Sequence, residues 1–194
     1  MTNFSALYDS CVLYPAPLRD LLMYLALTDL FRAKWTDQIH EEWIRNVAIN
    51  RPDLAREALE RTRDKMNQHV RDCLVVGYDS LISGLTLPDP DDRHVLAAAI
   101  RSNSSVIVTY NLKDFPDNSI GQYGIEAQHP DEFILHLIDL SPETVCAAVS
   151  AHRTGLKNPP KTVEEYLKTM KKQNLHKTVS KLSDFSELML SDED

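Results

Sequence analysis

Residues 89–115, DPDDRHVLAAAIRSNSSVIVTYNLKDF, contain the pattern that decides the fold. Apolar residues between Val95 and Ile100 recur with helical spacing after a proline and several acids, so a helix is predicted there. The next segment, SVIVTY at residues 105–110, is rich in β-branched residues and predicts a buried strand. A helix that leads directly into a buried strand is typical of a chain in which the two alternate.

The rest of the chain continues this alternation. The strands expected from their apolar runs are FSALY at 4–8, CLVVGY at 73–78, SVIVTY at 105–110 and IEAQ at 125–128. The helices expected from periodicity and capping residues lie within 18–31, 35–50, 52–70, 130–140, 142–151 and 161–173. Alternating strands and helices predict an α/β fold with a parallel sheet covered on both faces.

Composition narrows the class of protein. A chain of 194 residues, of which 43% are hydrophobic, suffices for one domain and an appendage. No apolar run approaches the length of a membrane span, and the first ten residues lack the basic start of a secretory signal. Three scattered cysteines fit a reducing cytoplasm, so we expect a cytoplasmic protein without disulfides or zinc. With only five glycines, the chain has neither a P-loop nor a dinucleotide-binding motif.

Charge is distributed unevenly along the chain. The net charge is −8, which argues against broad nonspecific adhesion to nucleic acid. Residues 153–181, however, carry eight basic residues and two acidic ones, and the acidic tail that follows reverses the sign. The pair Pro159-Pro160 marks a break within this region. We therefore expect a domain at 1–150 and a lysine-rich helical extension at 151–194, which ends in a frayed acidic tail and contacts the domain, a second subunit or another protein.

Four acidic residues are the main functional candidates, and each is expected near the carboxyl edge of the sheet, where open α/β folds bind ligands. They are Asp9, Glu42, Asp92 and Asp114. Carboxylates that gather without basic partners repel one another by roughly 3 kcal/mol per pair at about 5 Å. A divalent cation removes that repulsion, and hard oxygen ligands suit Mg²⁺ or Mn²⁺. The pattern favours metal-assisted phosphodiester hydrolysis.

Each of these acids also has a purely structural interpretation. Asp9 can cap the turn that follows the first strand, and Glu42 can be an ordinary solvated helix residue. Asp92 belongs to an acidic run in which Asp89 or Asp91 is the expected helix cap, but Asp92 lies on the side of the helix that packs inward. Asp114 alone reads more readily as a turn residue.

Polar neighbours of these acids also have both a functional and a structural interpretation. Thr109 and Asn111 add oxygen donors at the end of the same strand, although Asn111 reads equally well as a turn residue. Cys11 reads as a core thiol, and Ser10 lacks the glycines of a nucleophile elbow. For His94, as for His40, an ordinary half-buried or surface position is the expected one.

Taken in order, five motifs of the chain resemble those of PIN-domain nucleases. They are LYDSCVLYP, the TxxIxxEW helix, DPDDRHVLAAAI, VIVTYNLKDFP and GIEAQHPDEFILHL. The resemblance covers residues 4–140. It implies a PIN-like Rossmann-type α/β/α sandwich with a central parallel sheet of four or five strands, to which the helical extension is added. It also implies a Mg²⁺- or Mn²⁺-dependent endoribonuclease, in bacteria often the toxin of a VapC-type toxin–antitoxin pair.

The resemblance also assigns roles to residues. Asp9, Glu42, Asp92 and Asp114 match the acidic quartet, and Thr109 matches the hydroxyl position beside it. Many members of the family place an acid where this chain has Asn111, so either Asp114 takes that role or the fourth ligand is weakened. The remaining expected site residues are the supporting Ser10 and the phosphate contacts Arg93, Lys113 and Arg101.

In the expected mechanism, Asp9, Asp92 and Asp114 hold one or two ions, Glu42 assists through a water, and RNA is the substrate. An antitoxin and a second copy of the chain are the expected protein partners, and no membrane is involved. Two other interpretations stay open. One is a catalytically impaired PIN fold that serves as a binding scaffold for a protein or nucleic acid; the other is a phosphoacceptor receiver domain, which lacks its usual acidic pair here.

Overall fold

In the computed structural model, which describes residues 4–185, four parallel strands form one sheet in the order β2-β1-β3-β4. The strands are β1 (Ser5–Tyr8), β2 (Arg32–Lys34), β3 (Val106–Val108) and β4 (Glu126–Gln128). β1 and β3 are almost wholly buried, which agrees with their continuous apolar sequences and with a sheet covered on both faces. The predicted α/β/α fold and parallel sheet are thus confirmed.

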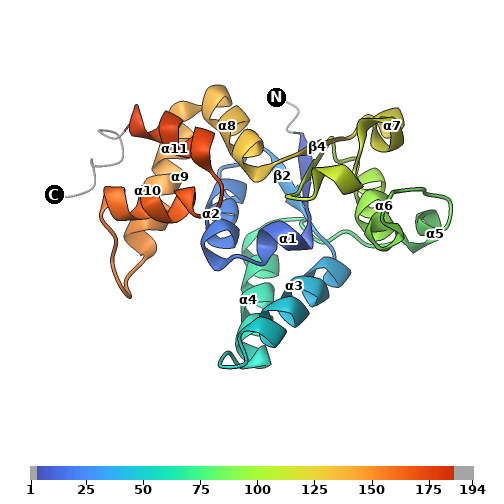
Figure 1. Cartoon of the computed structure of the whole chain (residues 1–194), viewed down its shortest axis with the longest axis horizontal. Coiled ribbons are helices and arrows are strands. Elements are labelled where there is room, and N and C mark those ends of the chain that lie inside the picture. The colour runs from blue at the N-terminus through green and yellow to red at the C-terminus, as the bar shows by residue number, and fades with distance from the viewer. Residues whose placement is uncertain (1–3, 186–194) are drawn as a thin grey trace. The chain divides into compact units, whose positions relative to one another are not determined.

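The chain divides into two compact units. The first contains residues 1–14 and 31–129, and it holds the sheet together with the helices α1, α3, α4, α5, α6 and α7 (Figure 1). Their bounds are α1 (Ser10–Leu13), α3 (Asp37–Asn50), α4 (Arg56–His69), α5 (Asp79–Ile82), α6 (Arg93–Arg101) and α7 (Asp117–Ile120). Short 3-10 turns η1 (Pro90–Asp92), η2 (Leu112–Asp114) and η3 (Gly121–Tyr123) connect some of them.

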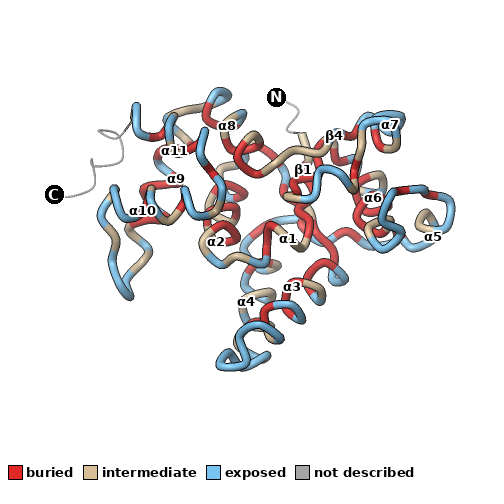
Figure 2. Tube along the Cα trace, viewed as in Figure 1, coloured by how far each residue is buried: buried red, intermediate tan, exposed pale blue. Residues whose placement is uncertain are grey.

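The core of the first unit surrounds β1, β3 and α6. The α6 residues from His94 to Ala99 are all buried, and α6 contacts both β1 and β3. Figure 2 shows this buried path along β1 and α6, whereas much of α4 is exposed. At residues 73–78 the predicted strand is wrong: only Leu74 forms a single bridge to Trp35. Val76 is 71% exposed, and Gly77 takes a left-handed conformation (φ 71°) that interrupts an extended segment.

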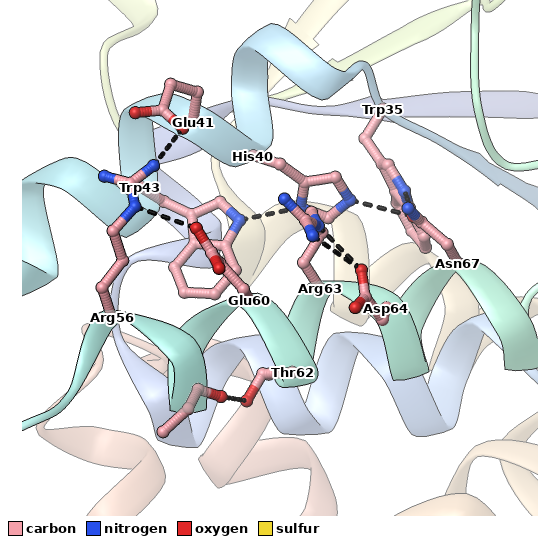
Figure 3. Close-up of polar contacts among 11 residues, drawn as sticks. Trp35, His40, Glu41, Trp43, Arg56, Glu60, Thr62, Arg63, Asp64 and Asn67 are labelled. Atoms are coloured by element: carbon pink, nitrogen blue, oxygen red, sulfur yellow. Dashed lines mark hydrogen bonds and ion pairs between the residues drawn. The ribbon is translucent and has the colours of Figure 1, made fainter.

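A polar relay joins α3 and α4 inside the first unit (Figure 3). The indole Nε1 of Trp43 donates to His40 Nδ1 at 2.9 Å. Because an indole nitrogen can only donate, His40 Nδ1 accepts, and the neutral ring carries its proton on Nε2. That Nε2 donates to Asn67 Oδ1 at 3.0 Å, and Trp35 Nε1 donates to the same oxygen at 2.7 Å. Burial lowers the pKa of His40, which keeps the ring in this neutral form.

The second unit is helical and contains residues 15–30 and 130–194. Its helices are α2 (Ala16–Ala26), α8 (Pro130–Leu140), α9 (Pro142–Gly155), α10 (Val163–Lys171) and α11 (His176–Ser183). α2 contacts α9 and α10, while α8 contacts α9 and α11. The expected domain boundary after residue 150 therefore falls inside α9, and the unit resumes at Pro130. Of the expected acidic tail, residues 186–194 lie outside the described part of the chain.

Side-chain hydrogen bonds explain how two helices of the second unit begin, one through a local signal and one through a distant residue. α10 starts with a capping box, in which Thr162 Oγ1 accepts from the Glu165 amide at 3.2 Å and the Glu165 carboxylate accepts from the Thr162 amide at 3.0 Å. α11 is capped from a different helix. The buried Asp131 of α8 accepts hydrogen bonds from the amides of Lys177 at 2.9 Å and Thr178 at 2.8 Å.

Candidate active site

The carboxyl ends of two neighbouring strands bring the first two site residues together. Tyr8 pairs with Val108, so Asp9 and Thr109 follow β1 and β3 at the same edge of the sheet. The Thr109 hydroxyl donates to Asp9 Oδ2 at 2.7 Å across one hundred residues of sequence. The sequence predicted both residues at strand ends, and the family resemblance placed Thr109 beside the acids, but the hydrogen bond itself was not predicted.

Asp9 is a buried carboxylate held by uncharged donors. It is 3% exposed, and its Oδ1 accepts from the Ser10 amide at 2.6 Å, which caps α1. The Cys11 thiol donates to Asp9 Oδ2 at 3.1 Å. No lysine or arginine forms an ion pair with Asp9 within residues 4–185. Its charge is therefore oriented but not neutralised.

Cys11 supports Asp9 and is not activated as a nucleophile. Its sulfur lies 3.3 Å from Thr109 Oγ1 and accepts from the Tyr110 amide at 3.3 Å. Burial, and then the negative charge of Asp9, raise the pKa of the Cys11 thiol well above its ordinary value. Because only the thiolate attacks, the core-thiol interpretation of Cys11 agrees with its surroundings.

Asp92 lies close enough to other carboxylates to be destabilised by them. It ends η1, directly before α6, and makes no capping hydrogen bond. Burial raises its pKa to about 7, and the charges of Asp9, Asp89 and Asp114 add to the effect. The capping role falls to Asp89, whose Oδ1 accepts from the Asp91 amide at 2.9 Å. Three of the four predicted acids thus share one field of negative charge.

Glu42 is attached to this cluster through a different set of contacts. Its Oε1 lies 2.8 Å from Nε2 of His94, a residue of α6 that is 4% exposed. Burial acts to raise the pKa of Glu42, but the hydrogen bonds from His94 and Ser10 outweigh it, and the net shift is downward. Ser10 also lies against Asp9, with its Oγ 3.4 Å from Asp9 Oδ1. Ser10 therefore links the environments of Glu42 and Asp9.

The partnership of His94 and Glu42 was missed by sequence reasoning. His94 was expected to be an ordinary half-buried or surface histidine, and nothing local in either helix connects it to Glu42. Because the Glu42 carboxylate is ionised, it accepts, and His94 donates from Nε2. The structure leaves His94 Nδ1 buried without a hydrogen-bond partner in the described part of the chain.

The remaining predicted residues fall at different places. Asp114 ends η2 and is half-buried, and the Asn111 amide donates to Thr109 Oγ1 at 3.0 Å. Lys113 is exposed beside Asp114. Arg93 is tied to η1, because its Nε donates to the carbonyl of Pro90 at 2.8 Å. These residues stay near the carboxylates.

Arg101 does not reach the cluster. It lies in the last turn of α6, whereas Asp92 precedes the first turn. At 1.5 Å per residue, the two are separated by about 13 Å along the helix. Its guanidinium lies instead next to Gly77, where a Cβ atom would be 3.6 Å from Arg101 Nε. The expected phosphate contact of Arg101 is therefore not supported by its position.

The donor set fits a hard divalent cation. Asp9, Asp92 and Asp114 offer only oxygen atoms, and their mutual repulsion gives a cation a reason to bind. Among residues 4–185, no three His, Cys, Asp or Glu side chains already converge as a complete ligand set. Mg²⁺ commonly keeps several waters and uses only one or two carboxylates, so such convergence is not required for its binding.

Comparison with known protein families agrees with this arrangement. Residues 5–113, more than half of the chain, match the family profile described as PIN domain. The chain belongs to the PIN-domain family. The interpretation as a receiver domain is therefore excluded. In this PIN-domain protein the matched residues contain Asp9, Glu42 and Asp92, together with Thr109.

Two further findings concern the rest of the PIN-domain protein. Residues 130–184 match a profile described as VapC50 C-terminal domain, and these residues belong to the helical second unit. A Mycobacterium tuberculosis (strain ATCC 25618 / H37Rv) protein named "Putative ribonuclease VapC50" is 41% identical over 97 residues, which are 50% of this chain and 57% of that protein. The match thus spans little more than half the length of this curated relative. No solved structure matches the chain.

Proposed function

We propose that this PIN-domain protein is a Mg²⁺- or Mn²⁺-dependent endoribonuclease. The observation that carries the proposal is the uncompensated cluster of Asp9, Asp92 and Asp114 at the carboxyl end of the sheet, in which burial and neighbouring charges raise the pKa of Asp92 to about 7. The similarity to a protein named as a ribonuclease supports RNA as the substrate.

The chain's own residues prepare this site in two ways. Thr109 and the Ser10 amide hold Asp9 as an oriented carboxylate, so it does not have to rearrange when charge develops at the substrate. His94 and Ser10 hold Glu42 ionised, which leaves it able to accept a proton from an attacking water. Arg93 and Lys113, which are adjacent in sequence to Asp92 and Asp114, are the proposed contacts of substrate phosphates.

A bound Mg²⁺ or Mn²⁺ ion, held by Asp9, Asp92 and Asp114, would supply Lewis-acid activation of water and neutralise charge at the scissile phosphate. The same ion reconciles an acidic protein with an anionic substrate. Asn111 stands where many family members have an acid, and Asp114 takes the role of the fourth ligand in this proposal.

The test compares adjacent acids. Asp9→Asn and Asp92→Asn are expected to lower Mg²⁺-dependent cleavage of a fluorogenic single-stranded RNA by at least about 100-fold, because each removes charge that the ion needs. Asp91→Asn is the matched control, since Asp91 is exposed in the same acidic run. Circular dichroism checks that all three variants stay folded. Full cleavage by Asp9→Asn, or cleavage that survives EDTA, refutes the proposal. Absence of Mg²⁺- or Mn²⁺-dependent cleavage by the parent refutes it as well and favours the binding scaffold.

We further propose that the chain is the toxin of a toxin–antitoxin pair, as the VapC50 similarities suggest. Its expected partners are a small antitoxin and a second copy of the chain, and size-exclusion chromatography with light scattering tests the dimer. No helix among the described residues is long and apolar enough to cross a membrane. A cytoplasmic location stays a prediction.

A further inference from the structure

The lysines of the second unit fall into two groups. Lys177 pairs with Glu132, and Lys181 Nζ lies 3.3 Å from Asp139 Oδ1, so these two positive charges are compensated by α8. By contrast, Lys161, Lys168 and Lys172 form no ion pair with any acid in residues 4–185. The concentration of lysine seen in the sequence thus contains a compensated set and an uncompensated set.

Three of the uncompensated lysines, Lys161, Lys168 and Lys172, line one hollow. This hollow, of about 320 Å³, is lined by Pro159, Pro160, Lys161, Glu165, Lys168, Thr169 and Lys172. Lys168 and Lys172 are four residues apart at the C-terminal end of α10, so they lie on one side of the helix, about 6 Å apart along its axis. We name this feature the lysine hollow.

The wall of the lysine hollow opposite α10 is fixed in place. Arg153 Nη1 of α9 donates to the carbonyl of Lys161 at 3.2 Å, which fastens the loop that carries Lys161. The acid that lines the hollow, Glu165, uses its carboxylate in the capping box of Thr162. Three lysines and one acid therefore line the hollow, the carboxylate of that acid is already hydrogen-bonded, and the site keeps an excess of positive charge.

We propose that the lysine hollow binds backbone phosphates of the RNA substrate. This inference rests on the proposed function, because it assigns a second contact surface to the same RNA. Uncompensated lysines matched to a polyanion account for binding that depends on charge and not on sequence. Because the chain's net charge of −8 repels a polyanion, a local positive surface favours the binding of RNA at that place.

The lining favours RNA over an acidic protein partner. Protein interfaces depend on large apolar or aromatic side chains at their centre. None of the large hydrophobic residues found exposed among residues 4–185 lines the lysine hollow, whose apolar contribution comes from two prolines. A surface made of lysines, a threonine and prolines matches a phosphate chain better than a protein surface.

The test measures RNA affinity in paired variants. In an Asp9→Asn background, which preserves the RNA, fluorescence anisotropy of a labelled single-stranded RNA is recorded at several salt concentrations. K168Q/K172Q is expected to bind about tenfold more weakly at physiological salt and to lower the slope of log K against log salt by about 1.4, because two phosphate contacts are lost. K65Q/K171Q removes the same charge from exposed positions outside the hollow and is expected to bind like the parent.

The outcomes separate this proposal from the nuclease proposal. The proposal for the lysine hollow is wrong if K168Q/K172Q binds RNA as tightly as the parent, or if both paired variants lose the same RNA affinity. This holds even if the chain with Asp9 intact cleaves RNA. A selective loss in K168Q/K172Q supports the hollow even if no cleavage is found. If a labelled poly-glutamate peptide binds the parent as tightly as RNA does, and K168Q/K172Q no longer binds that peptide, the hollow serves an acidic protein and the proposal is wrong.

Discussion

Asp92 is a site residue whose ionised side chain destabilises the folded protein. In the folded protein its pKa is raised to about 7, by burial first and then by the charges of Asp9, Asp89 and Asp114. The unfolded chain ionises this side chain near the ordinary value of about 3.9. Between these values the folded state binds more protons than the unfolded state, so this group lowers stability progressively as pH rises from about 4 to 7.

Asp92→Asn is therefore expected to stabilise the metal-free protein. Because Asn cannot ionise, the variant should gain on the order of 1 kcal/mol at pH 8 in EDTA, an amount reduced for the partial exposure of Asp92, and little at pH 4. Urea unfolding of the two proteins at both pH values measures the difference, with Asp91→Asn as the control. A variant less stable than the parent at pH 8 would show that the repulsion is absent.

For single residues, the sequence predicted those positions that depend on the adjoining strand or turn. Asp9 and Thr109 each follow an apolar run, so both were expected at the carboxyl edge of the sheet, and the family resemblance placed Thr109 beside the acids. The contact between His94 and Glu42 could not be predicted, because it depends on how α6 packs relative to α3. Arg101 was placed near the site because of its sequence proximity, but the length of α6 carries it away.

At the scale of elements, the hairpin of α3 and α4 depends on one amide oxygen. Asn67 Oδ1 accepts from both Trp35 and His40, which are fully buried. Asn67→Leu removes this acceptor and leaves two buried donors unpaired, so a loss of about 2–4 kcal/mol of unfolding free energy is expected.

Urea unfolding tests this value. Gln68→Leu is the matched control, because Gln68 is the exposed neighbour on the same helix, and less than about 0.5 kcal/mol should change there. If Asn67→Leu costs no more than this control, the relay in Figure 3 does not stabilise the hairpin.

Elements with strong local signals were predicted correctly. SVIVTY formed β3, and the helix predicted within 35–50 formed α3, which Thr36 caps because its Oγ1 accepts from the Ile39 amide at 3.0 Å. CLVVGY had similar composition but formed only one bridge. Strand formation there required a partner along its length, and composition does not supply that information.

At the scale of the whole molecule, both units contain a buried neutral histidine. In the second unit, burial lowers the pKa of His152 to about 4, while its Nδ1 lies 2.9 Å from the hydroxyl of Tyr166. The unfolded chain binds a proton near pH 6.5, so the stabilising effect of the neutral ring is present above that pH and is lost as pH falls toward 4.

His152→Phe should reduce this pH dependence. The parent is expected to lose about 2–3 kcal/mol more than the variant between pH 7 and pH 4, because the phenyl ring has no proton to take up. Thermal or urea unfolding followed by circular dichroism at several pH values measures the two slopes. His69→Phe, at an exposed position, is the control, and identical slopes for His152→Phe and the parent would contradict the assignment.

The division of the chain into two units was not predicted from the sequence. Residues 15–30 read as one more helix of the sheet domain, but α2 contacts α9 and α10, more than a hundred residues later. Apolar periodicity shows that a helix has a face to bury and does not show what will cover it. The predicted boundary at residue 150 reflected the change in charge, whereas the structure follows packing.

The early position of α2 has a consequence for synthesis of the protein. When α2 leaves the ribosome, its four fully buried leucines have no cover, because α9 and α10 follow more than a hundred residues later and have not yet been translated. The nascent chain must therefore carry uncovered leucines through most of its elongation, when such surfaces attract aggregation and chaperones. A stop codon near residue 130 would produce a polypeptide that never receives the partners of α2.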